Sequence, residues 1–253
     1  MGIFAIIPAR LGSSRLPGKP LADICGRPMI VRVVERVKVF DCIHGVVVAT
    51  DSEQIASCVE KDGYQAVMTD SSHPSGTDRI AQAASLLGLD SDDIVVNVQG
   101  DQPLVEEGCI RSILGALSRD KEAEMATAAC HISEAEARDP NRVKVVIDRS
   151  GRALYFSRAL IPFDRDGFFK PGQRPYLRHL GLYAYTVDFL QRFVELTPTR
   201  LELIEKLEQL RVLENGYKIT VSMVDEAPMD VDTPEDLERI RQEFRAFSDQ
   251  GNG

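Results

Sequence analysis

The sequence predicts an α/β protein with a three-layer, Rossmann-like fold, in which helices cover both faces of a mostly parallel central sheet. Short runs of β-branched apolar residues alternate with helical patterns along the first hundred residues. These runs are too continuously apolar for a sheet with one face in water, which indicates parallel strands buried on both faces. Polar clusters follow the ends of the runs, where open parallel sheets bind their ligands.

The first four apolar runs are expected to form the parallel strands. They span Ile3–Pro8, Gly45–Thr50, Ala66–Thr69 and Ile94–Gln99. Between them, the spacing of apolar residues predicts helices over about 28–40, 52–62 and 76–87. Right-handed crossovers would bring the carboxyl ends of these strands to one edge of the sheet, so we expect the ligand there.

The pattern changes after residue 105. It predicts a helix over 106–119, a strand at Val143–Ile147, a helix at Leu201–Asn215 and a strand at Ile219–Val224. Residues 155–185 are rich in aromatic residues, Arg, Gly and Pro, and resemble an insertion with loops of its own. We therefore expect one domain over 1–247, with a smaller inserted region at about 140–200 and a frayed tail at 248–253.

The last helix has clear start signals. Thr233 is expected as the N-cap and Pro234 in the first turn, while Glu235 and Asp236 complement the helix dipole. Its predicted apolar face consists of Leu237, Ile240, Phe244 and Phe247.

Charge and composition exclude some classes of function. The formal net charge of −9 disfavours a general nucleic-acid binder, which needs a basic surface. The first thirty residues nevertheless hold four cations (Arg10, Arg15, Lys19 and Arg27) against the single acid Asp23. This local excess of positive charge suggests a site for a small phosphorylated ligand.

A cytoplasmic location is expected. No apolar run approaches the ~20 residues that span a bilayer, so no membrane insertion is expected. The first arginine follows the N-terminal apolar run, unlike the order in a signal peptide. The five cysteines are odd in number and never form a C-x-x-C pair, which favours reduced thiols over disulfides or a zinc cluster.

The segment from Pro8 to Pro20 leaves the first strand with two glycines and three cations. Glycine lets backbone N–H groups approach phosphate oxygens closely. The segment is not a P-loop, because five residues separate Gly12 from Gly18 and Pro20 stands where Ser or Thr is required. A basic surface loop is the general alternative, but the position directly after the first strand favours phosphate binding.

Two aspartates are candidate magnesium ligands. Asp101 follows the most hydrophobic run and Gln99, and Asp232 directly precedes the last helix. A carboxylate at a strand end suits a Mg²⁺ ion that faces nucleotide phosphates. An ordinary turn at Asp101 and a capping role for Asp232 are the structural alternatives.

Seven blocks of the sequence, taken in order, resemble a known family. They are Ile7–Leu21, Ala49–Asp51, Ser75–Arg79, Val96–Asp101, Leu154–Arg158, Arg178–Tyr183 and Val231–Asp236. Together they closely resemble the 3-deoxy-manno-octulosonate (Kdo) cytidylyltransferases, from residue 3 to about 245. The resemblance implies a nucleotidyltransferase that moves CMP from CTP to Kdo, releasing pyrophosphate, in lipopolysaccharide biosynthesis. It also implies a homodimer, with the inserted region serving in sugar binding and dimer contact.

The resemblance assigns roles to individual residues. Lys19, Asp101 and Asp232 would be catalytic, and the two aspartates would bind Mg²⁺. The nucleotide would be held by Pro8, Ala9, Arg10, Arg15, Lys19, Ser75, Gly76 and Gln99. The sugar would be held by Arg158, His179, Tyr183, Glu208 and Gln209.

Several of these assignments have structural alternatives. Arg158 suits a bidentate contact with the sugar carboxylate, yet a surface salt bridge is nearly as plausible. His179 fits a satisfied buried histidine equally well, and Glu208 and Gln209 fit solvent-facing helix positions. The exposed-looking Phe163, Phe168 and Phe169 suit either a dimer contact or packing on the sheet.

Two departures from the family pattern bear on the acceptor sugar. Gln102 stands where the family usually has a glutamate, and Asp230 adds a carboxylate shortly before Asp232. An 8-amino version of Kdo, or another acidic sugar such as a sialic acid, is the alternative acceptor. A non-catalytic nucleotide-binding module is a more distant alternative, which retention of both candidate metal carboxylates disfavours.

Overall fold

A computed structural model describes residues 1–12, 16–170 and 172–250, with the side chains of 247–250 left out. Two compact units make up the chain. Unit 1 consists of Met1–Glu107 and Pro228–Gly253, and unit 2 consists of Gly108–Ala227. The segment expected as an insertion at 140–200 lies inside unit 2; the single-domain boundary at 247 stays a prediction.

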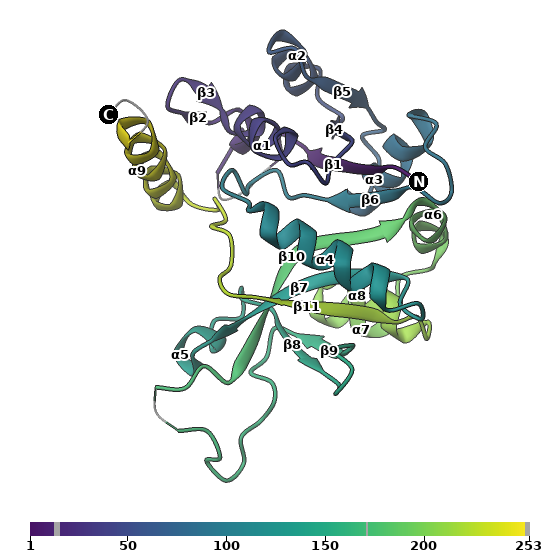
Figure 1. The fold of residues 1–253 in the computed structure, drawn as a ribbon, viewed down its shortest axis with the longest axis vertical. Helices are drawn as coiled ribbons and strands as arrows, with labels where there is room; N and C mark the ends of the chain where they lie inside the picture. Colours follow the sequence, from purple (N-terminus) through teal and green to yellow (C-terminus); the bar gives the residue numbers. More distant parts are fainter. Residues whose placement is uncertain (13–15, 171, 251–253) are drawn as a thin grey trace. The chain divides into compact units, whose positions relative to one another are not determined.

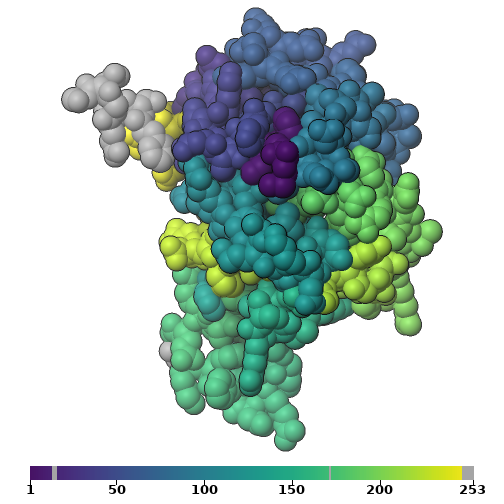
Figure 2. Space-filling model, turned by 45° about the vertical axis from the view of Figure 1, so that its right-hand side comes forward, coloured from purple at the N-terminus to yellow at the C-terminus, as the bar shows by residue number. Residues whose placement is uncertain are grey.

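Unit 1 contains a parallel sheet, as predicted (Figure 1). Its strands are β1 (Ile3–Ala9), β4 (Gly45–Thr50), β5 (Gln65–Met68) and β6 (Ile94–Asn97). They lie in the order β6-β1-β4-β5. In β4 the successive residues Val47 to Thr50 are all buried, so both faces of the sheet are covered. On the face drawn in Figure 2, only a small dark-purple area of the first residues reaches the surface.

The helices of unit 1 begin close to the predicted positions. They are α1 (Met29–Lys38), α2 (Glu53–Lys61), α3 (Gly76–Leu86) and α9 (Pro234–Gln250). A 3-10 turn, η1 (Lys19–Leu21), and a short hairpin, β2 (Asp23–Ile24) with β3 (Arg27–Pro28), precede α1. Ser75 caps α3, since its hydroxyl accepts from the backbone N–H groups of Thr77 (3.1 Å) and Asp78 (3.3 Å).

A hydrophobic cluster joins the two ends of the chain within unit 1. Ile24 and Met29 from the N-terminal part pack with Val231, Leu237 and Ile240. Burying each side chain of this size stabilises the fold by about 1.5–3 kcal/mol. The cluster therefore fixes the segment that carries Asp232 against the loop region that follows β1. The predicted apolar face of α9 is confirmed for Leu237, Ile240 and Phe244; the Phe247 side chain lies outside the described residues.

Unit 2 is built around a mixed sheet. Its strands are β7 (Met125–Ile132), β8 (Lys144–Ile147), β9 (Ala153–Ser157), β10 (Tyr176–Thr186) and β11 (Ile219–Val224). β7 pairs antiparallel with β10 and parallel with β11, and β8 and β9 form a hairpin. The helices are α4 (Glu107–Arg119), α5 (Glu134–Ala137), α6 (Val187–Glu195), α7 (Arg200–Glu205) and α8 (Gln209–Glu214).

One sequence prediction in unit 2 is wrong, and another is incomplete. The helix expected over 201–215 is two helices, because Lys206 adopts the left-handed conformation (φ 55°) and ends α7. The break leaves Leu207 and Leu210 both buried. The region at 155–185, expected as an insertion with loops of its own, has irregular structure over 158–170 and 172–175. It also contains most of β10, an eleven-residue strand that β7 and β8 border and that was not predicted.

No helix among the described residues is long and apolar enough to cross a membrane.

Candidate active site

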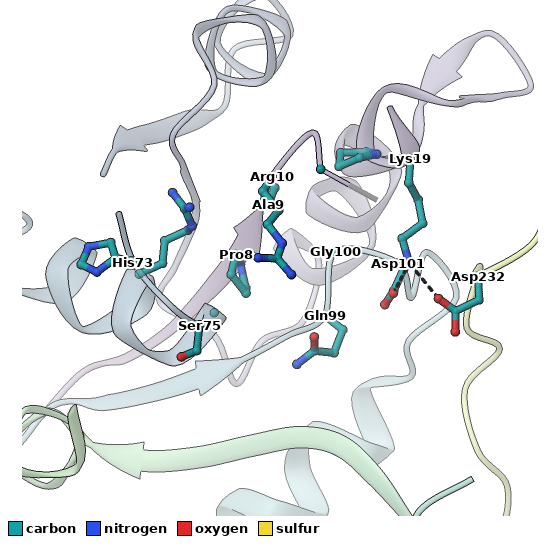
Figure 3. Close-up of a pocket in the computed structure, with 14 residues that line it drawn as sticks. Pro8, Ala9, Arg10, Lys19, His73, Ser75, Gln99, Gly100, Asp101 and Asp232 are labelled. Carbon is teal, nitrogen blue, oxygen red and sulfur yellow. Dashed lines mark hydrogen bonds and ion pairs between the residues drawn. The ribbon is translucent and has the colours of Figure 1, made fainter. Parts of the chain in front are cut away.

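A cavity of about 400 Å³ opens in unit 1 at the carboxyl ends of β1 and β6 (Figure 3). This is the edge at which the sequence predicts the ligand. The cavity is lined by Pro8, Ala9, Arg10, Gly12, Lys19, Pro20, His73, Ser75, Gly76, Arg79, Gln99, Gly100, Asp101 and Asp232. It therefore brings together every predicted nucleotide-binding and metal-binding residue except Arg15, which lies outside the described residues.

Close backbone packing shapes the floor of the cavity. A Cβ atom at Gly100 would lie 3.2 Å from the carbonyl oxygen of Pro8, which is tighter than an ordinary contact. At Gly76, the first residue of α3, an added Cβ would meet the Pro8 ring carbons at 3.5 Å, an ordinary contact. Glycine at position 100 therefore lets the ends of β1 and β6 approach each other.

Lys19 lies between the two candidate metal carboxylates (Figure 3). Its ammonium Nζ is 2.5 Å from Asp101 Oδ2 and 3.1 Å from Asp232 Oδ1. Burial lowers the pKa of Lys19, but the charges of Asp101 and Asp232 and their hydrogen bonds more than offset burial and raise it above its usual value. The side chain is therefore cationic at neutral pH, and the three groups together carry one net negative charge.

These two aspartates fit a magnesium ion in one specific way. Among the described residues, no group of three or more His, Cys, Asp or Glu side chains could hold a metal by itself. Asp101 and Asp232 nevertheless already share one cation, the Lys19 ammonium. Mg²⁺ commonly binds one or two carboxylates and takes its other ligands from substrate phosphates and water. The pair therefore suits a metal that arrives with a phosphorylated substrate.

Two cavity residues, His73 and Arg79, were missed as site residues. Arg79 is buried in α3, where it donates to Thr69 and forms an ion pair with Asp51 (3.1 Å) after β4. His73 Nε2 lies 2.6 Å from Gln82 Oε1. An arginine within the apolar face of a predicted helix, beside Ile80 and Ala83, was the available signal for Arg79.

In unit 2, the structure brings His179 and Tyr183 together on β10. Their ring centroids are 5.4 Å apart, and the edge of Phe156 approaches His179 at 4.8 Å. His179 Nε2 lies 3.0 Å from the hydroxyl of Thr127. Burial, and to a smaller extent the charge of Arg178, lowers the pKa of His179 to about 3, so its imidazole is neutral.

Glu208 and Gln209 lie at the start of α8. Burial raises the pKa of Tyr183 well above its usual range, and the charge of Glu208 adds to this effect, so the phenol keeps its proton. Gln209 does not face solvent: it is buried, with 3% of its surface exposed. Its Nε2 has no hydrogen-bond partner among the described residues, which makes it a donor available to a ligand.

Arg158 follows β9 and is held by a different set of partners. Its guanidinium donates to three backbone carbonyls, those of Glu205 (2.8 Å), Pro140 (3.2 Å) and Lys206 (3.5 Å). Its backbone N–H donates to the Glu205 carboxylate (2.9 Å). Cations at a helix C-terminus are favourable, so Arg158 caps the end of α7. These backbone carbonyls are not the surface salt bridge given as one alternative, and a contact with the sugar carboxylate stays a prediction.

Comparison with known proteins agrees with this geometry. The family model for cytidylyltransferases matches residues 4–219. A 3-deoxy-manno-octulosonate cytidylyltransferase from Polynucleobacter necessarius is 52% identical over 240 residues, covering 94% of this chain and 93% of its own length. One from Syntrophobacter fumaroxidans is 53% identical over 241 residues, covering 95% and 96%. A solved CMP:2-keto-3-deoxy-manno-octonic acid synthetase in complex with CTP has a TM-score of 0.89 at 39% identity, covering 97% of this chain and 99% of its own.

The fold and the family match thus define a nucleotidyltransferase, and the chain belongs to the cytidylyltransferase family. Within that family its relatives at about half identity over nearly full length are the 3-deoxy-manno-octulosonate cytidylyltransferases, the group that the sequence blocks resemble.

Proposed function

We propose that the protein catalyses the reaction of CTP with Kdo to give CMP-Kdo and pyrophosphate, as a step in lipopolysaccharide biosynthesis. The observation that carries this proposal is the juxtaposition of Lys19, Asp101 and Asp232 in the cavity at the end of β1. The names of the relatives at 50–53% identity support the choice of CTP and Kdo.

In the proposed reaction, the anomeric hydroxyl oxygen of the sugar forms a bond to the α-phosphorus of CTP. The bond from that phosphorus to the bridging oxygen breaks, and pyrophosphate leaves in line with the attacking oxygen. The hydroxyl proton passes to solvent. Phosphoryl transfer of this kind depends on positioning and charge neutralisation more than on covalent chemistry by the protein.

The residues of the cavity have distinct proposed roles. Arg10 and Lys19 neutralise the triphosphate, and Arg15 from the same segment is proposed to join them. Backbone at Pro8 and Ala9, with Ser75, Gly76 and Gln99, frames the cytosine and ribose. Asp101 and Asp232 would hold Mg²⁺, which when bound lowers the pKa of a coordinated hydroxyl and screens phosphate charge.

The residues of unit 2 are proposed to select the sugar. Neutral His179, protonated Tyr183 and the unpartnered Nε2 of Gln209 offer hydrogen bonds to sugar hydroxyls. Glu208 adds an acceptor. Arg158 is proposed to attract the sugar carboxylate by its positive charge, while its guanidinium donates hydrogen bonds to the carbonyls at the end of α7. We further propose a cytoplasmic homodimer, on the strength of the family resemblance.

Release of pyrophosphate from CTP tests the proposal. The purified protein is assayed with Kdo, 8-amino-Kdo and sialic acid in parallel, with Mg²⁺ present and then removed by EDTA. Fastest release with Kdo, abolished by EDTA, is expected. Preference for 8-amino-Kdo or sialic acid would reassign the acceptor, and CTP binding without release under any condition would identify a non-catalytic binding module.

A further inference from the structure

Two hydrogen bonds tie the Asp101 loop to the Asp232 segment within unit 1. Gln102 Nε2 donates to Asp230 Oδ1 at 2.7 Å. The backbone N–H of Val231 donates to the carbonyl of Asp101 at 3.0 Å. We name these two bonds the carboxylate clamp. Both bonds involve residues next to the cavity carboxylates. Gln102 directly follows Asp101, and Asp230 and Val231 directly precede Asp232.

The side chain of Gln102 is deeply buried, with 3% of its surface exposed. A carboxylate can only accept hydrogen bonds, so the amide nitrogen of Gln102 must be the atom that faces Asp230. The bond is charge-assisted and therefore stronger than one between neutral groups. The other amide atom, Oε1, is buried with no hydrogen-bond partner among the described residues. An unpaired buried acceptor costs about 1–3 kcal/mol, so Gln102 is a poor choice for stability alone.

The charges explain why an amide suits this position. Two adjoining segments bring three carboxylates together, those of Asp101, Asp230 and Asp232. The ammonium of Lys19 pairs with Asp101 and Asp232, and its single positive charge offsets one of the three negative charges. A fourth carboxylate at position 102 would face Asp230 directly, and like charges at this distance repel. The neutral amide instead converts the added carboxylate of Asp230 into an attractive partner.

We propose that Gln102 is a positioning residue for the candidate metal carboxylates. Through Asp230 it holds the 228–233 segment against the loop after β6, so that Asp101 and Asp232 keep the separation at which they share one cation. Gln102 acts through Asp230 and does not itself bind the metal. The inference rests on the proposed role of these carboxylates in nucleotidyl transfer.

The test reverses the polarity of the clamp. In Q102E, two carboxylates face each other; in Q102E/D230N, the new carboxylate accepts from an amide and the bond is restored with donor and acceptor exchanged. D230N alone completes the double-mutant cycle. At pH 8.5, two quantities are measured: the Mg²⁺ concentration for half-maximal rate at saturating CTP, and the binding of Mn²⁺–CTP to the protein by water-proton relaxation enhancement.

We expect Q102E to weaken metal-dependent binding about tenfold, the size typical of residues that support metal ligands. The KM for CTP at saturating metal should change much less. Q102E/D230N should recover most of the loss. Equal metal affinity in Q102E and the wild type, or a double variant no better than Q102E, would overturn the proposal.

Controls separate positioning from folding. Q65E adds the same charge at an exposed position on β5 and should leave both measurements unchanged.

A second variant applies if Q102E fails to fold. Q102M keeps the volume of the side chain without its hydrogen-bond donor: weakened metal binding in folded Q102M supports the clamp, and wild-type affinity refutes it. Wild-type protein that binds Mn²⁺–CTP but releases no pyrophosphate would contradict the proposed function, while the relaxation titration would still decide the role of Gln102.

Discussion

Three side chains from distant parts of the chain meet in the active-site cavity. Lys19 comes from the loop after β1, Asp101 from the loop after β6, and Asp232 from the residues just before α9. Each could be predicted from sequence because each follows or precedes a strongly patterned element. The signal for Arg79, an arginine beside apolar residues of the predicted helix over 76–87, was present but was not used. His73 gave no such signal, since its position depends on a contact with Gln82 of α3.

Removal of the Asp101 charge should separate binding from turnover. Because Lys19 and Arg10 remain to hold the triphosphate, D101N should bind CTP nearly as well as the wild type when both are titrated without Mg²⁺. Its turnover should fall at least about a hundredfold, as for the loss of one charge-stabilising group. Isothermal titration with CTP and pyrophosphate-release kinetics measure the two quantities. D92N, at an exposed aspartate, is the control, and near-normal turnover of D101N would remove Asp101 from the catalytic residues.

His179 should make the stability of unit 2 depend on pH. Its pKa is about 3 in the fold and about 6.5 when unfolded. The unfolded chain therefore takes up a proton first as the pH falls, and stability is lost from about pH 6.5 downward. The expected loss between pH 7 and pH 5 is about 2 kcal/mol.

Urea unfolding followed by circular dichroism measures this loss. H179Q, which keeps a polar side chain but cannot titrate, should lose about 2 kcal/mol less than the wild type over the same range. H131Q, at an exposed histidine, should behave like the wild type. Identical pH profiles for H179Q and the wild type would show that His179 does not carry the effect.

At the scale of elements, periodic patterns predicted the structure where local preference and tertiary packing agree. The strands β1, β4 and β6 form continuous apolar runs, and these runs predicted the three strands correctly. β7 was not predicted, because its sequence Met-Ala-Thr-Ala-Ala-Cys-His-Ile has weak strand preference and becomes a strand through its pairing with β10 and β11. The break at Lys206 was not predicted either, because a lysine rarely adopts the left-handed conformation and no local pattern marks it. In the structure, Arg158 donates to the Glu205 and Lys206 carbonyls at this break.

The N-terminus of α9 depends on a capping interaction that follows Asp232 directly. Thr233 Oγ1 accepts from the backbone N–H of Asp236 at 3.2 Å, and the Asp236 carboxylate accepts from the backbone N–H of Thr233 at 3.0 Å. Burial would raise the pKa of Asp236, but the hydrogen bonds that its carboxylate accepts from the Thr233 hydroxyl and from the backbone N–H groups of Asp232 and Thr233 outweigh burial and hold the pKa below its usual value. The contribution of this carboxylate is complete above about pH 4 and is lost on acidification below it.

Loss of the cap should therefore destabilise the protein measurably. T233A removes the hydroxyl acceptor and should lower the free energy of unfolding by about 1 kcal/mol at pH 7. T233S keeps the hydroxyl and should remain within about 0.5 kcal/mol of the wild type. Chemical denaturation of the three proteins measures the difference, and equal stability of T233A and T233S would mean that the helix start does not depend on this bond.

For the whole molecule, the division into two units places the candidate nucleotide and metal residues in unit 1 and the candidate sugar residues in unit 2. Unit 2 also carries two strongly exposed aromatic side chains, Phe163 and Phe168, with 80% and 81% of their surfaces exposed. Their neighbour Phe169 packs edge-on against Tyr176 (5.5 Å), so packing on the sheet accounts for only one of the three. Exposed aromatic side chains are typical of protein contacts.

Substitution of Phe163 and Phe168 by charged residues should dissociate the proposed homodimer into monomers. The wild type is expected to sediment at twice the mass of one chain, and F163D/F168D to sediment as a monomer at micromolar concentration. L86D adds a charge to an exposed leucine of unit 1 and should not change the mass. Analytical ultracentrifugation distinguishes these results; a double variant that stays dimeric would place the interface elsewhere.

The position of Lys19 predicts that nucleotide and metal binding are coupled. Because its ammonium pairs with both Asp101 and Asp232, we expect a metal ion bound by these carboxylates to displace it, which would leave the ammonium available to phosphate. Each ligand is then expected to raise the affinity for the other by the same factor, which for such coupling is about 5–150-fold. In K19M, Mn²⁺ should bind more tightly than to the wild type without CTP, and CTP should enhance that binding less. Electron paramagnetic resonance titrations measure both affinities, with K61M as the control. An unchanged enhancement by CTP would mean that Lys19 does not couple the two ligands. A reduced enhancement would make this lysine an internal counter-ion, which favours binding of the two ligands together.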